Sequence, residues 1–187
     1  DILIWCISRI MQQKEERRND ISGVIRTTPH ELLTGIARGT GGQDYVELDK
    51  AIDRLRNTQV QTNIRSGRKK YIKFMYLGDT EGEGAEAGNL QEARSLTLRV
   101  PPWLLDGIMA GNVLTLDREY FLLKGGLERA IYRIARKHAG SQPDGWKCKL
   151  DTLQRKTGSE GAAKKFAYRV REMCKLEDDP KRRLPGY

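Results

Sequence analysis

The sequence holds few residues suited to metal binding or catalysis. It has two histidines, His30 and His138, in 187 residues, and neither shares a ligand or catalytic spacing with the other, with a cysteine or with a carboxylate pair. RGTGG and GDTEGEGAEAG are rich in glycine, but neither is followed by the Lys-Ser or Lys-Thr of a P-loop. These gaps exclude a metal site, a nickase of the His-hydrophobic-His type and nucleotide hydrolysis. We therefore expect no enzyme, no metal and no cofactor.

Cysteine and long apolar runs are also scarce. Cys6, Cys148 and Cys174 are odd in number and far apart, and no C-x-x-C occurs, so a disulfide framework is not expected and a reducing cytoplasm is the natural location. The run ILIWCI is far too short to span a bilayer and has no basic leader, so we expect no membrane partner. Because the chain begins at Asp1 inside a helical pattern, we expect a fragment of a longer protein.

Positive charge is what the sequence has in excess. Lys and Arg number 34 against 25 Asp and Glu, which gives a net charge of +9 and a pI near 9.6. Such a balance indicates a polyanionic partner such as nucleic acid, or an acidic membrane face. Residues 65–73 carry +5 and residues 147–175 carry +6, so the rest of the chain is slightly acidic. Charge that served solubility alone would be scattered along the chain.

The first half begins with a pattern of helix, strand, helix, turn and helix. Apolar residues at helical spacing predict a helix over residues 2–18, and GVIRT predicts a strand. A second helix is expected with Thr28 as its N-cap, Pro29 in its first turn and Glu31 completing a capping box. After the turn ARGTGG, a third helix is expected to begin near Gln43.

Strands are expected after this third helix. VQTNI and YIKFMYL are rich in β-branched and aromatic residues, so they predict a hairpin with the basic turn RSGRKK. SLTLRV predicts a further strand. The acidic, glycine-rich segment GDTEGEGAEAGNLQEA between them is expected to be a mobile loop. VPPWLLDGIMAGN then predicts a helix that begins at proline and ends at glycine.

The second half repeats the order of the first. LERAIYRIARKH predicts a helix, and WKCKL predicts a short strand with Trp146, Cys148 and Leu150 inward. Asp151 is expected to cap the short helix TLQRKT, Gly158 to turn the chain, and Ser159 to cap a helix that runs to about residue 175. EDDPKRRLPGY would begin a second hairpin. The predicted fold class is α+β, mainly helical, with two tandem winged-helix domains over residues 1–112 and 113–187, the second wing being truncated.

The last helix of each helix-turn-helix presents one face to a core and the other to solvent. In the first half the outer face is Gln43, Val46, Lys50, Arg54 and Asn57, opposite Tyr45, Leu48, Ile52 and Leu55. In the second half it is Lys164, Tyr168, Arg171 and Lys175, opposite Phe166, Val170 and Met173. Surface helices usually mix charge signs to gain ion pairs between successive turns, and the second outer face has no carboxylate. Its composition suits the phosphates and base edges of a major groove.

Long blocks of the chain resemble the plasmid replication initiator protein A (RepA) family. They are GVIRTTPHELLTGIARGTGGQDYVELDKAIDRLRNTQVQTNI, VLTLDREYFLLKGGLERAIYRIARKHAG and LQRKTGSEGAAKKFAYRVRE, and the similarity runs from DILIWCIS to RRLPGY. The resemblance implies a bacterial plasmid initiator with two winged-helix domains that binds direct repeats (iterons) of duplex DNA at the origin. It further implies origin opening, recruitment of the host initiator and the replicative helicase, and repression of its own promoter as a homodimer.

The residues and the resemblance together give a set of DNA-binding candidates. The principal recognition helix is expected to use Lys164, Tyr168, Arg171 and Lys175, with Lys165 and Arg169 on its flanks. Gln43, Lys50, Arg54 and Asn57 are their counterparts in the first domain, where acidic neighbours predict a smaller contribution. Arg65, Arg68, Lys69 and Lys70 suit a wing that lies along the phosphate backbone.

Two other readings of the same sequence stay open. One is a winged-helix transcriptional regulator that binds an operator, whose footprint would be an inverted repeat rather than tandem direct repeats. The other is a protein-interaction module whose first domain dimerises through SLTLRV or through residues 113–123. The basic face of the last helix would then be only a solvated surface.

Overall fold

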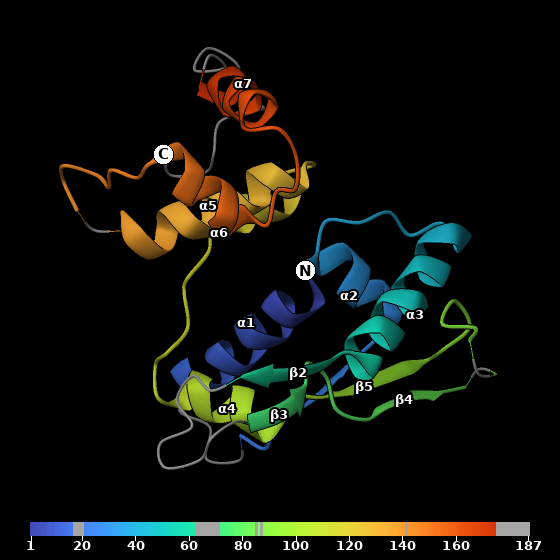
Figure 1. The fold of residues 1–187 in the computed structure, drawn as a ribbon. Helices are drawn as coiled ribbons and strands as arrows, with labels where there is room; N and C mark the ends of the chain where they lie inside the picture. Colours follow the sequence, from blue (N-terminus) through green and yellow to red (C-terminus); the bar gives the residue numbers. More distant parts are fainter. Residues whose placement is uncertain (17–20, 63–71, 85, 87, 141, 175–187) are drawn as a thin grey trace. The chain divides into compact units, whose positions relative to one another are not determined.

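The computed structural model describes residues 1–16, 21–62, 72–84, 86, 88–140 and 142–174 of the chain. The chain divides into two compact units, Asp1–Val113 and Leu114–Tyr187, whose elements are drawn in Figure 1. The expected basic turn with Arg65, Arg68, Lys69 and Lys70, the candidate Lys175 and the expected second hairpin at residues 177–187 lie outside the described residues.

Unit 1 packs its helices against a small sheet (Figure 1). Its helices are α1 (Ile2–Glu15), α2 (Pro29–Gly35), α3 (Gly42–Asn57) and α4 (Pro102–Met109), which confirms the four helices expected here, with α1 ending earlier than residue 18. Apolar residues at helical spacing supply the core from α1, α2, α3 and α4: Ile2, Trp5, Cys6, Ile10, Leu32, Leu33, Tyr45, Leu48, Ile52, Leu104 and Ile108 are all buried. Burial raises the pKa of the Cys6 thiol to about 12, so this thiol stays protonated and behaves as an apolar core group.

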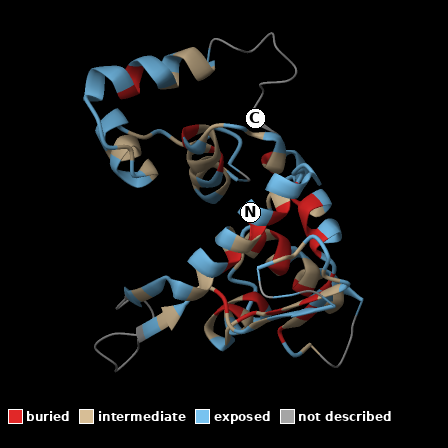
Figure 2. Cartoon of the chain, turned by 90° about the vertical axis from the view of Figure 1, so that its right-hand side faces the viewer, coloured by how far each residue is buried: buried red, intermediate tan, exposed pale blue. Residues whose placement is uncertain are grey.

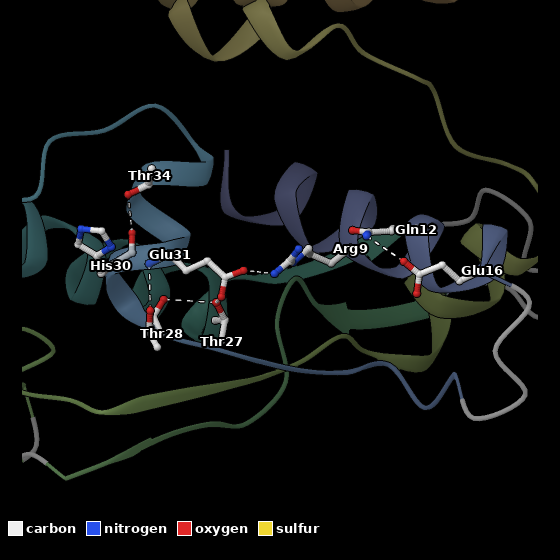
Figure 3. Close-up of polar contacts among 8 residues, drawn as sticks. All are labelled: Arg9, Gln12, Glu16, Thr27, Thr28, His30, Glu31 and Thr34. Carbon is white, nitrogen blue, oxygen red and sulfur yellow. Dashed lines mark hydrogen bonds and ion pairs between the residues drawn. The ribbon is translucent and has the colours of Figure 1, made fainter.

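The N-terminus of α2 is capped, although not by a reciprocal capping box. The Thr28 hydroxyl accepts a hydrogen bond from the Glu31 N–H at 3.1 Å, as expected. The Glu31 carboxylate, however, accepts from the Thr27 hydroxyl at 2.7 Å and pairs with Arg9 of α1 (Figure 3). Glu31 therefore ties α1 and β1 to the start of α2 instead of closing the cap.

The three-stranded sheet of unit 1 corrects one expectation. Its strands are β1 (Val24–Thr27), β5 (Ser95–Arg99) and β4 (Thr80–Glu83), antiparallel in the order β1-β5-β4. β4 falls inside the segment expected to be a loop. The sequence TEGE has little strand propensity, so it forms a strand only because it pairs with β5. β5 is central, with β1 on one side and β4 on the other. Dimerisation through SLTLRV by edge pairing would therefore have to displace one of these strands.

The predicted hairpin is present as a separate two-stranded sheet. β2 (Gln59–Thr62) pairs antiparallel with β3 (Ile72–Met75), and Val60 lies opposite Phe74. Trp103 of α4 anchors this hairpin, because its ring lies 4.1 Å from the ring of Phe74 and its indole N–H donates to the Met75 carbonyl at 3.0 Å. The end of β3 is therefore held against α4.

Unit 2 is helical in its described residues, with a thin core. It comprises the 3₁₀ helix η1 (Arg118–Leu122) and the helices α5 (Gly126–His138), α6 (Leu150–Thr157) and α7 (Ala163–Cys174). Its buried side chains are Tyr120, Leu127, Tyr132, Phe166 and Ala167. In Figure 2 the buried positions gather in unit 1, and the helices of unit 2 are mostly intermediate or exposed.

Three local predictions in unit 2 are wrong. Residues 146–149 form no strand, because no partner strand exists among the described residues of this unit. α6 begins at Leu150 with Lys149 as its N-cap, and the Asp151 carboxylate accepts from the adjacent Thr152 N–H instead. α7 begins at Ala163, too far along the chain for Ser159 to cap it. The turn at Gly158 is confirmed, since its φ of 67° is left-handed.

Candidate nucleic-acid interface

Helix α7 has the two faces that its sequence predicts. Phe166 (3% exposed) and Ala167 are buried, and Val170 and Met173 are half-buried beside them. The opposite side carries exposed cations and one exposed aromatic ring, that of Tyr168, which is 61% exposed. Lys164 and Arg171 are the exposed cations of this side, and Lys165 and Arg169 are exposed on its flanks. The structure thus places together on α7 all the candidates of this helix except Lys175, which lies outside the described residues.

The cations of α7 lack carboxylate partners within the described part of the chain. No ion pair there involves any of the four, and the helix contains a single carboxylate, the half-buried Glu172. Lys164 and Lys165 also lie in the first turn, which has no acidic residue, so they face the positive end of the helix dipole. Cations at that end are mildly unfavourable, by roughly 0.3–1 kcal/mol each, whereas an anion there is stabilised. The charge of this surface is therefore better suited to binding an anion than to stabilising the fold.

The turn between α6 and α7 is held by one amide that the sequence reading missed. The Gln154 side-chain amide donates to the Gly161 carbonyl at 2.8 Å and to the Ser159 carbonyl at 3.3 Å. Together with the left-handed Gly158, these bonds fix how the chain leaves α6 and enters α7. The sequence signal for this interaction is a glutamine one helical turn before the glycine that ends the helix.

Helix α3 has the predicted inner and outer faces, but its charges are balanced differently from those of α7. Its exposed outer face is Gln43, Val46, Lys50, Arg54 and Asn57, and Tyr45, Leu48 and Ile52 are buried behind it, with Leu55 half-buried. The Glu47 carboxylate accepts from the Gln43 amide and from the Lys50 ammonium, each at 3.2 Å. Two of the four DNA-binding candidates of this helix are therefore already engaged with a carboxylate.

Other acids reinforce this difference. Asp53 lies 4.0 Å from the guanidinium of Arg56. The pKa of Asp49 is raised, first by its partial burial and then by the nearby Asp53 charge. α3 thus holds four carboxylates against three cations, and its outer face is a weaker electrostatic match to phosphates than that of α7.

The side chains suited to binding a metal ion are scattered over the described part of the chain. No group of three or more His, Cys, Asp or Glu side chains among them could hold a metal ion. His30 is exposed on α2, and His138 ends α5 in a half-buried position. No helix found in the described ranges combines the length and the apolar character required to cross a membrane.

Comparison with known proteins places the chain in a family. The replication initiator protein A family matches it over residues 1–187. The chain belongs to the replication initiator protein A family. A curated relative from Wigglesworthia glossinidia brevipalpis, provisionally named a replication protein, is 30% identical over 189 residues, which cover all of this chain and 66% of that protein. This chain is thus shorter than the relative it matches.

Solved structures similar to this initiator-family chain agree on the fold. A structure of domains 2 and 3 of RctB superposes with a TM-score of 0.67 at 16% identity, covering 94% of this chain and 67% of that one. A second RctB structure of the same domains gives a TM-score of 0.63 at 17% identity over 96% of this chain and 69% of that one. At this identity the likeness concerns the mixed helix and sheet fold alone.

Proposed function

We propose that this chain is the DNA-binding part of a plasmid replication initiator that acts on tandem direct repeats (iterons) of duplex DNA at an origin in the bacterial cytoplasm. The observation that carries the proposal is the outer face of α7. Lys164, Arg171 and Tyr168 are exposed there, without carboxylate partners in the described residues, on the second of two helices joined by a short turn. Membership of the initiator family supports the same reading.

In this proposal each unit acts as a winged helix. α6 and α7 form one helix-turn-helix, with α7 in the major groove, where Lys and Arg donate to base edges and Tyr168 packs on a sugar or a thymine methyl. α2 and α3 form the other, and the β2–β3 hairpin is its wing, whose turn with Arg65, Arg68, Lys69 and Lys70 follows the phosphate backbone.

The wider role follows the family and needs no chemistry from this chain. Binding of the repeats would favour opening of the neighbouring duplex and recruit the host initiator and the replicative helicase. A homodimer would repress the promoter of the initiator gene. We propose no enzymatic activity, no cofactor and no metal for this chain.

A binding experiment tests the DNA assignment. The duplex that residues 1–187 prefer is first selected from a random library, and its affinity is then measured over a range of salt. With about six phosphates neutralised, log K should fall against log salt with a slope of about −5. Footprinting on the natural replicon should protect tandem direct repeats, whereas protection of an inverted repeat would favour an operator-binding regulator.

A double substitution tests the role of α7 directly. Lys164→Ala with Arg171→Ala should abolish specific binding and leave the circular dichroism spectrum and thermal unfolding unchanged, since both side chains are exposed. The matched control is Lys124→Ala with Arg133→Ala, which removes one exposed lysine and one exposed arginine from the same unit outside α7. Equal affinity of the α7 variant and the control would exclude α7 as the principal reader.

A further inference from the structure

A second cationic cluster lies in unit 2 outside the face of α7. The imidazole of His138, at the end of α5, stacks on the indole of Trp146, with ring centroids 4.4 Å apart and planes 15° from parallel. The ammonium of Lys156 on α6 lies 3.4 Å from Nε2 of the same imidazole. Three segments, the end of α5, the following loop and α6, thus converge on one histidine.

The charged groups that act on His138 are both positive. Lys137 precedes it on α5 and Lys156 faces it from α6, and both lysines are exposed. Neither lysine forms an ion pair with a carboxylate in the portion of the chain that is described. The carboxylate of Asp151 on α6 accepts from the Thr152 N–H instead. A packing contact between α5 and α6 accounts for the stacked rings but not for two lysines placed beside them without a counter-charge.

We propose that Lys137, His138 and Lys156 form a phosphate-binding site that takes a phosphodiester of the duplex backbone. The inference rests on the proposed DNA binding and adds to it a contact that the α7 face does not include. α6 is the first helix of the helix-turn-helix, and in such motifs this helix crosses the phosphate backbone. The stack on Trp146 fixes the plane of the imidazole, so Nε2 is held beside Lys156 where an anion could meet both groups.

Binding of a phosphate at this site should add a proton to His138. In the free protein the pKa of His138 is lowered, first by loss of water around the ring and then by the charges of Lys156 and Lys137. The negative charge of a bound anion offsets the effect of both lysines on the pKa of His138 and favours the imidazolium. The Nε2–H of the imidazolium can then donate to a phosphate oxygen. The complex then holds more protons than the free protein, so affinity falls as pH rises through the pKa of the bound state.

Nuclear magnetic resonance provides the decisive measurement, with His30 as an internal control. The two histidines of residues 1–187 are titrated in the free protein and in the complex with the selected duplex. The pKa of His138 should be higher in the complex than in the free protein, because the bound anion favours the imidazolium. The ring resonances of His30, which is exposed on α2, should differ much less between the free protein and the complex. A third titration with inorganic phosphate alone distinguishes a DNA contact from a general phosphate site.

Two substitutions separate phosphate binding from packing. Lys156→Met should weaken all duplexes similarly and reduce the magnitude of the salt slope by about one, as removal of one phosphate contact does. Its control, Lys124→Met, removes an exposed lysine of the same unit outside the cluster and should leave the slope nearly unchanged. His138→Phe keeps an aromatic ring against Trp146, so it should retain the fold and lose the dependence of affinity on pH that lies between the pKa values of His138 in the free and bound states.

The outcomes distinguish this inference from the function on which it rests. If the protein binds the duplex but the pKa of His138 does not rise and Lys156→Met behaves as Lys124→Met, the phosphate site is wrong and the proposed function stands. An equal rise with inorganic phosphate alone would overturn the assignment to the DNA backbone. If the protein binds no duplex even at low salt, both proposals fail.

Discussion

Helices α3 and α7 are each the second helix of a pair joined by a tight turn, but their charges are arranged differently. On α3 a carboxylate, Glu47, already engages Gln43 and Lys50, and the helix holds more acids than bases. On α7 the four cations have no carboxylate partner in the described residues. Two helices in similar local positions thus differ in charge: the charges of α3 are partly paired within the helix, whereas the cations of α7 have no carboxylate partner in the described residues.

The two helices also differ in how they are anchored. α3 buries Tyr45, Leu48 and Ile52 in the larger core of unit 1, whereas Phe166 is the one large side chain that α7 buries among its described residues. The position of the more cationic surface thus depends on fewer contacts.

The largest predicted effect comes from replacing Phe166, the large buried side chain of α7. Phe166→Ala should cost about 3–5 kcal/mol, because it removes a buried aromatic ring and leaves a cavity. A cost of this size is comparable with the total stability of a small unit, so unit 2 should lose its cooperative unfolding transition in urea. Leu48→Ala in α3, at about 2–5 kcal/mol, should shift the transition of unit 1 without abolishing it. An unchanged transition of unit 2 in Phe166→Ala would show that α7 is anchored elsewhere.

Charge reversal on the two outer faces should have the next largest effect. Arg171→Glu on α7 should weaken DNA binding by about two orders of magnitude, because it removes one phosphate or base contact and adds repulsion. Arg54→Glu makes the same change on α3, which is already acidic, and should weaken binding by only about fivefold. Fluorescence anisotropy with the selected duplex measures both variants. Equal losses would mean that the two helices contribute equally and that the internal pairing on α3 has no consequence.

The turns before the two helices place different residue types in the left-handed backbone conformation. The turn before α7 has Gly158 at a φ of 67°, whereas the turn before α3 has Ala37 at a φ of 53°. A left-handed backbone costs a residue with a Cβ about 1 kcal/mol and costs glycine almost nothing. Ala37→Gly should therefore stabilise unit 1, and Gly158→Ala should destabilise unit 2, each by about 1 kcal/mol in urea unfolding. The same sign of change in both variants would contradict this account.

Much of this comparison follows from patterns along the chain. Helical periodicity predicts α3 and α7 and both of their faces, and turn chemistry predicts the Thr28 cap and the Gly158 turn. These features depend on residues within about one or two helical turns of each other, where side-chain spacing and backbone preference decide the structure. The hairpin β2–β3 is also predicted, because its two strands are rich in β-branched and aromatic residues and follow one another along the chain.

What the sequence reading missed depends on partners distant in sequence or on side-chain placement. β4 has weak strand propensity and exists because β5 pairs with it, whereas WKCKL alternates like a strand and finds no partner in the described part of unit 2. The charge pattern shows the acids near α3 but not that one carboxylate engages both Gln43 and Lys50, because that requires particular rotamers. The cluster at His138 joins residues from three segments and has no signature in the sequence.

The smallest predicted effect tests whether ion pairing within α3 limits the contribution of this helix to DNA affinity. Glu47→Gln keeps the size of the side chain and removes the charge that engages Gln43 and Lys50. With Lys50 released toward phosphates and one repulsive charge removed, DNA affinity should rise about threefold, and the salt slope should steepen by up to about one. Glu15→Gln on α1 is the matched control, because it also removes one exposed carboxylate from unit 1 but lies outside α3. A similar gain in both variants would indicate a general effect of net charge, whereas a gain confined to Glu47→Gln would show that α3 lies against DNA and that its own carboxylate limits the contact.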